Sequence, residues 1–140
     1  MQLPDSLYNS IIKRGQILHS DNFVDIGHGK FFVIIGISED TIVGYFFINS
    51  NINRFLMDKP EQMAVQYLMR KVDYNFLRYD SFLCANKILK LNKADIIAGL
   101  QDNSVTIIDE MKQEHLEEVL DMVRNSDLFK EIEKKMFFYK

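Results

Sequence analysis

The sequence predicts a mainly β protein of one domain, residues 1–140: a small antiparallel β-barrel at about 13–108, followed by C-terminal α-helices at about 109–138. Short runs of β-branched and aromatic residues alternate with short polar segments, which is typical of antiparallel strands. The connections are too short for the crossover helices that parallel strands need. The last third of the chain instead shows helical spacing of its apolar residues.

The clearest strand pair lies in residues 30–50, where two apolar runs, 31–35 and 45–48, flank the polar break Ser38-Glu39-Asp40. Strands that are apolar on both faces must be covered on both, so this hairpin should lie at the centre of the fold. Polar residues mark its ends: His28 and Lys30 before the first run, and Asn49, Ser50 and Asn51 after the second. Antiparallel pairing brings these ends together, and we expect the functional site there.

The remaining elements follow in order. Residues 5–13 predict a short helix, Gly15 ends it, and a short strand follows; residues 20–29 and 49–60 are irregular. A strand is expected at 64–69, a turn at 71–75, and then either two strands or one bent strand at 80–85 and 87–91. A helical turn at 93–100, ended by Gly99, precedes a short strand at 105–108.

Two helices should close the chain. Asp109 is the expected cap of the first, whose buried stripe follows the i, i+3, i+4, i+7 spacing: Leu116, Val119, Leu120 and Val123. The second helix, at about 127–138, should carry Leu128, Ile132 and Met136 on one side.

Composition limits the function classes. The net charge of -3 excludes a strongly basic surface over the whole molecule, but residues 1–93 carry 11 Lys and Arg against 9 Asp and Glu, whereas residues 94–140 carry 6 against 11. An anionic ligand should therefore bind the N-terminal two thirds. The sequence shows no signal peptide and no apolar run long enough to span a bilayer, so we expect a cytoplasmic protein with no membrane association.

Metal and cofactor chemistry finds no support in the motifs. The three histidines lack metal-ligand spacing, and the only cysteine, Cys84, has no partner for a zinc site or disulfide. Gly27-His28-Gly29 precedes a strand, whereas a phosphate-binding loop precedes a helix. We expect no metal and no cofactor, and we interpret Cys84 as a buried structural thiol.

A second group of residues has RNA-binding chemistry. Arginines neutralise phosphates and tyrosine rings stack on unpaired bases. Arg54, Arg70 and Arg78 are the candidate RNA-binding residues, interleaved with Tyr67, Tyr74 and Tyr79. The alternative interpretation is that the tyrosines pack in the core and the arginines are ordinary surface cations.

The order of several segments resembles the MazF/PemK-like toxin family, of the Kid/CcdB-type barrel. Lys13-Arg14-Gly15-Gln16-Ile17 is similar to the opening KRGDI/V strand of the family, and Gly29-Lys30 with the following apolar run is similar to its G-x-R-P strand. Asp80-Ser81, followed by the run from Lys87, resembles its D-S strand and its R-T-I-D-K-x-x-L segment. The resemblance covers about residues 13–125.

The resemblance implies an SH3-like barrel that acts as a metal-independent endoribonuclease toxin on single-stranded RNA. It also implies an antitoxin protein as partner and a homodimer. Lys30 would stabilise the phosphate charge, Asn49 and Ser50 would orient it, and His28 is the candidate acid or base. Lys30 stands where the family has arginine, and Asn49 or Ser50 where it has threonine or serine.

These departures support two other hypotheses. Lysine lacks the bidentate fork of arginine, and asparagine serves neither as an acid nor as a base. The first alternative is a non-catalytic SH3-like binding module that has lost RNase activity. The second is an interaction protein unrelated to this family.

Overall fold

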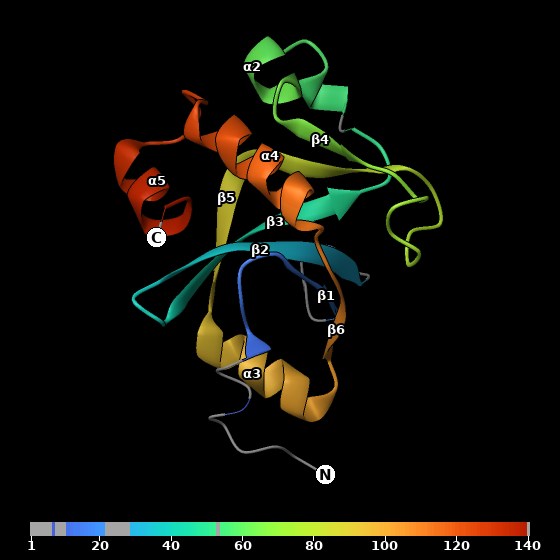
Figure 1. Cartoon of the computed structure of the whole chain (residues 1–140), viewed down its shortest axis with the longest axis vertical. Coiled ribbons are helices and arrows are strands. Elements are labelled where there is room, and N and C mark those ends of the chain that lie inside the picture. The colour runs from blue at the N-terminus through green and yellow to red at the C-terminus, as the bar shows by residue number, and fades with distance from the viewer. Residues whose placement is uncertain (1–6, 8–10, 22–28, 53, 140) are drawn as a thin grey trace.

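The fold is a six-stranded antiparallel sheet with helices on both of its sides, in the order β4-β5-β3-β2-β1-β6 (Figure 1). The computed structural model describes residues 7, 11–21, 29–52 and 54–139. The strands are β1 (Gln16–Ser20), β2 (Lys30–Ser38), β3 (Ile42–Asn49), β4 (Gln66–Met69), β5 (Ser81–Asn92) and β6 (Val105–Glu110). The helical elements are η1 (Arg54–Leu56), α2 (Pro60–Met63), α3 (Lys93–Asp102), α4 (Gln113–Arg124) and α5 (Glu131–Phe137).

The predicted antiparallel sheet and C-terminal helices are confirmed, but the fold is mixed α/β and the sheet does not close into a barrel. Among the described strands, β4 pairs with β5 and β6 pairs with β1, so the two edges of the sheet do not meet. Register shifts within three of the strand pairs bend the sheet. Helices cover the apolar faces that barrel closure would otherwise bury.

The central hairpin is confirmed as β2 and β3, joined by a tight turn. Glu39 and Asp40 have φ angles of 51° and 59°, as the two central residues of a type I′ turn require. The Thr41 amide donates a hydrogen bond of 3.0 Å to the Ser38 carbonyl and closes the turn. The predicted alternatives for residues 80–91 resolve into the single strand β5, whose register against β3 shifts between Tyr45 and Phe47.

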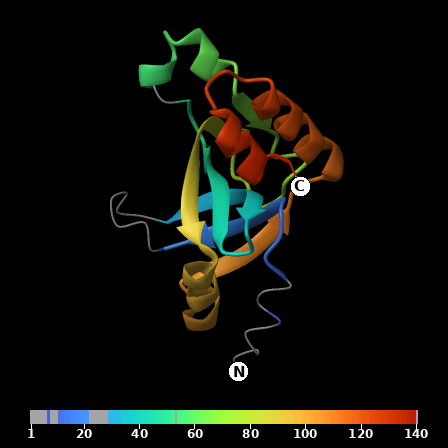
Figure 2. The same cartoon turned by 90° about the vertical axis from the view of Figure 1, so that its left-hand side faces the viewer.

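Alternate strand residues face two separate hydrophobic cores. Val33 and Phe46 belong to a core between the sheet and α4 and α5, which we call the covered face of the sheet. Their neighbours Phe32 and Tyr45 point the other way, into a smaller core that includes Ile96 of α3. Figure 2 shows α4 and α5 to one side of the strands and α3 at the other end of the sheet. The expectation that the hairpin is covered on both faces is therefore confirmed for its middle, whereas its end at Lys30 and Asn49 is partly exposed.

The C-terminal helices differ from the prediction in their starts. Asp109 lies in β6, and α4 begins at Gln113, because the strand continues through Glu110 to pair with Gln16. The predicted stripe of α4 is confirmed, since Leu116, Val119, Leu120 and Val123 are all buried. Of the three residues expected on one side of the second helix, Leu128 and Met136 pack against the core, whereas Ile132 is 64% exposed.

The chain end packs tightly across the sheet. Phe137 lies over β2 and β3, where a Cβ on Gly36 would meet its carbonyl oxygen at 2.0 Å. The guanidinium of Arg14 donates to the Ile35 carbonyl at 2.7 Å, the Phe137 carbonyl at 2.9 Å and the Tyr139 carbonyl at 3.1 Å. The guanidinium of Arg124 donates to the Phe138 carbonyl. Two arginines thus fasten the last residues that cover the sheet.

The predicted helical turn after β5 is longer than expected. Gly99 lies inside α3, where its lack of a side chain admits Val105 of β6, and the helix ends at Asn103, with φ of 66°. The buried ammonium of Lys93 pairs with Asp40 at 2.6 Å and ties the start of α3 to the hairpin turn. The predicted helix at 5–13 lies largely outside the described residues.

Candidate functional site

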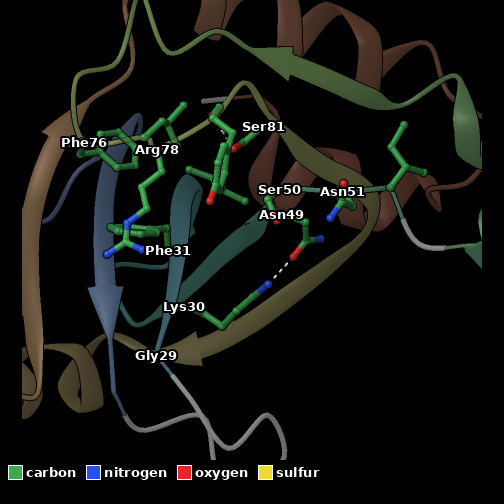
Figure 3. Close-up of a pocket in the computed structure, with 13 residues that line it drawn as sticks. Gly29, Lys30, Phe31, Asn49, Ser50, Asn51, Phe76, Arg78 and Ser81 are labelled. Carbon is green, nitrogen blue, oxygen red and sulfur yellow. Dashed lines mark hydrogen bonds between the residues drawn. The ribbon is translucent and has the colours of Figure 1, made fainter.

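The candidate site is an open groove of about 870 Å³ at the end of the central hairpin. The start of β2, the end of β3 and the loop that precedes β5 form its walls (Figure 3). Residues from 29 to 31, from 48 to 52, from 76 to 79 and Ser81 line it. The groove forms here because antiparallel pairing brings the polar ends of β2 and β3 together, as the sequence predicts.

Lys30 and Asn49 face each other across the hairpin. Phe31 pairs with Ile48 in the register, which places Lys30 beside Asn49, and the lysine ammonium donates a hydrogen bond to the asparagine Oδ1 (Figure 3). The ammonium also lies 5.2 Å from the centre of the Phe47 ring. Burial lowers the pKa of Lys30 from its ordinary value, because the charged form loses hydration. The groove therefore holds a partly desolvated cation with a fixed neighbour.

Aromatic rings and a second cation line the opposite wall. The rings of Phe31 and Phe76 lie 5.0 Å apart with an angle of 46° between their planes. Arg78 is exposed and extends along the groove toward Phe31 (Figure 3), and the side chain of Tyr79 is 65% exposed. The thirteen described residues that line the groove include Lys30 and Arg78 but no carboxylate. Such a lining favours an anionic ligand that carries flat apolar groups.

Small polar groups complete the site. Ser50 and Asn51 follow β3 and are exposed, so their side chains can reach a ligand in the groove. The Ser81 hydroxyl donates to the Tyr79 carbonyl at 2.9 Å and fixes the turn that presents Arg78 and Tyr79. Ser50 and Asn51 thus offer hydrogen bonds to a ligand, whereas Ser81 shapes the loop.

The predicted site residues separate into three groups. Lys30, Asn49, Ser50 and Arg78 meet in the groove. Arg54 in η1 and Arg70 after β4 are exposed but do not line it. His28 lies outside the described residues.

Phe31 and Phe76 line the groove without having been predicted as site residues, whereas Asn51 belongs to the polar hairpin end where the site was expected. Phe31 reads as one more apolar residue of a buried strand, and Phe76 lies in a loop without periodicity. The one available signal was the cluster of aromatic and basic residues at 74–79, from which Tyr79 and Arg78 were considered. Of the other tyrosines, Tyr74 is buried and shares a 2.8 Å hydrogen bond with Nδ1 of His115, so the alternative of tyrosines that pack in the core holds for it.

Cys84 of β5 does not line the groove and is half-buried, which corrects the expectation of a buried thiol. It is 2.9 Å from the Asn86 Oδ1 and accepts a 3.4 Å contact from the Gln66 amide, so two amides surround it. Within the described ranges, His, Cys, Asp and Glu residues form no cluster of three that could hold a metal ion.

Comparisons with known proteins do not assign this site to a family. No protein family matches the chain, and no curated protein is significantly similar to it. In the described part of the chain, no helix has the length and apolar character needed to cross a membrane.

Proposed function

We propose that the groove binds single-stranded RNA and that the chain is a metal-independent endoribonuclease of the MazF/PemK toxin type. The observation that carries the proposal is the lining of the groove: its described residues supply two cations, three aromatic rings and the exposed side chains of Ser50 and Asn51, and none of them is a carboxylate. Cations bind phosphates, and aromatic rings stack on bases that are not paired. This lining lies at the hairpin ends, where the resemblance places the cleavage residues.

Cleavage would require attack of the ribose 2′-hydroxyl on the adjacent phosphorus, with loss of the 5′-oxygen of the next nucleotide. The Lys30 ammonium would neutralise the developing charge on the phosphate oxygens, held in position by Asn49. The Ser50 hydroxyl would hydrogen-bond the phosphate, and Arg78 would hold a neighbouring one. His28, two residues before Lys30 in the sequence, is the proposed acid or base.

The remaining parts of the proposal follow from the same resemblance. The sheet would be an opened relative of an SH3-like barrel, supported by the succession of β1, β2 and β3 and by the bulges that bend it. An antitoxin would lay an acidic segment along the cationic groove, and the active form would be a cytoplasmic homodimer.

One observation favours a second candidate function, a binding module without RNase activity. Among the described lining residues there is neither a carboxylate nor an imidazole to take the proton from a 2′-hydroxyl. Such a module would bind RNA in the same groove and release it intact.

Incubation of the purified chain with a long unstructured RNA in EDTA tests the proposal. We expect discrete fragments, lost in Lys30→Met, kept or increased in Lys30→Arg, and unchanged in the control Lys135→Met, which alters an exposed lysine of α5. RNA that is bound but intact would establish the binding module. Failure to bind RNA at all would overturn both functions.

A further inference from the structure

Seven strand residues next to the groove share one face of the sheet. Across the neighbouring strands β3, β5 and β4, one row of paired residues is Asn49, Phe82 and Leu68. The next row is Phe47, Cys84 and Gln66. Lys30 joins this set through its hydrogen bond to Asn49. Directly opposed residues of antiparallel strands point to the same side. We call this set the open face: Lys30, Phe47, Asn49, Gln66, Leu68, Phe82 and Cys84.

The open face is the reverse of the covered face. The residues between its members, Ile48, Leu83 and Tyr67, pack in the core beneath α4. Phe82 is half-buried and belongs to neither hydrophobic core, and Leu68 is 47% exposed, whereas the half-buried Phe47 packs against the smaller core. In Figure 2, α4 and α5 lie to one side of β3 and β5, and the other side of these strands is turned away from both helices.

The chemistry of the open face matches that of the groove. It carries one cation, two aromatic rings and two amides, and none of its seven members is an acid. Lys30 and Asn49 belong to both surfaces, so the groove continues onto the open face without a break. From β2 to β4 the face spans three strand spacings of about 4.8 Å, or roughly 14 Å.

We infer that the open face is a stacking platform for the same RNA strand, which passes from the groove over the Lys30–Asn49 pair and lays an unpaired base on Phe82. The inference rests on the proposed RNA-binding function. Sheets of similar width stack two or three bases on strand aromatics in known RNA-binding domains. Paired bases hide their flat faces inside the duplex, so the platform selects single strands.

A tryptophan at position 82 gives a direct readout, because the chain contains none. A nine-nucleotide oligouridylate should quench the fluorescence of Phe82→Trp by stacking on the indole. It should leave the emission of Ile132→Trp unchanged, because Ile132 is exposed on α5, on the other side of the sheet.

Affinity measurements separate the platform from the groove. For the nonamer, Phe82→Ala should weaken binding roughly tenfold, as expected for the loss of one base–aromatic stack. Phe82→Leu, which keeps apolar volume but removes the ring, should weaken it similarly while keeping the melting temperature. The groove alone can hold a three-nucleotide oligouridylate, so both variants should bind it with an affinity within twofold of the wild type. Arg78→Ala should lower the affinity for both oligonucleotides.

The two proposals fail differently. Nonamer binding that is insensitive to Phe82→Ala and Phe82→Leu, without quenching of Phe82→Trp, overturns the platform and leaves the RNA-binding groove standing. Equal quenching of Ile132→Trp also overturns the platform. If neither oligonucleotide binds the wild-type chain, both the groove function and the platform are wrong.

Discussion

Leu83 and Phe82 are neighbours in β5, yet they lie in opposite environments. Leu83 is fully buried under α4 on the covered face, whereas Phe82 is half-buried on the open face and packs in neither core. Both are large and apolar, so hydrophobicity does not distinguish them; the alternation of the strand does. The comparison shows that one strand can supply stability through one set of residues and ligand binding through the next.

The largest expected effect comes from substitution of these two neighbours. Leu83→Ala should lower the free energy of unfolding by about 3 kcal/mol, because it leaves a cavity in the core. Phe82→Ala should lower it by about 1 kcal/mol, since only part of its ring is removed from water. Urea denaturation of both variants measures the difference. Equal losses would mean that the open face is part of the core.

The second prediction concerns the hydrogen bonds that hold residues 137–139 against the sheet. Arg14→Met removes the guanidinium that donates to the Ile35, Phe137 and Tyr139 carbonyls, and should cost about 2 kcal/mol. Lys13→Met is the matched control: its 3.3 Å pair with Glu110 is exposed, so the loss should stay below about 0.5 kcal/mol. Equal unfolding free energies for the two variants would show that Arg14 does not fasten the chain end.

A third, smaller effect should appear at alkaline pH. Burial and a hydrogen bond to Glu118 raise the pKa of Tyr67, on the covered face, to about 12. Because the folded protein favours the neutral phenol, this contribution is complete below about pH 10 and is lost as the pH rises toward 12. Subtraction of the Tyr67→Phe stability curve from that of the wild type should give a difference that falls over this window. A flat difference would contradict it.

The smallest effect on stability is expected at Lys30. Burial penalises its charge, while its hydrogen bond to Asn49 offsets part of that cost, so Lys30→Met should change the free energy of unfolding by less than about 0.5 kcal/mol. RNA affinity should nevertheless fall, because the groove loses one of its two cations. A large loss of stability would place Lys30 with the structural residues.

The sequence predicts the parts of the fold that depend on local pattern. The runs at 31–35 and 45–48 and the polar break between them specify the hairpin, and its polar ends specify Lys30, Asn49 and Ser50 as neighbours. The open sheet could not be predicted. Whether the two edge strands pair with each other or helices cover the apolar faces instead depends on contacts far apart in sequence. The start of α5 was missed: the helix begins at Glu131 rather than near Asp127, with the Lys130 amide bonded to the Glu133 carboxylate at 3.1 Å, so Leu128 lies before it.

The groove was only half predictable for the same reason. Lys30 and Asn49 meet through strand pairing, which has a sequence signature. Phe76 reaches Phe31 from a loop between β4 and β5, and no periodic pattern encodes that approach. Polar residues at strand ends are therefore easier to assign to a site than aromatic residues that a loop brings in.

The packing of Phe137 against Gly36 and Gly44 has a consequence for folding during synthesis. The six described strands leave the ribosome before α4 and α5 do, so the covered face stays exposed to water until residues 113–137 emerge. Its contacts join segments more than a hundred residues apart, as between Arg14 and Phe137, and such distant contacts slow folding. A nascent chain stalled before residue 137 would display an apolar sheet with two bare glycines, the kind of surface that chaperones recognise and that aggregates when left uncovered.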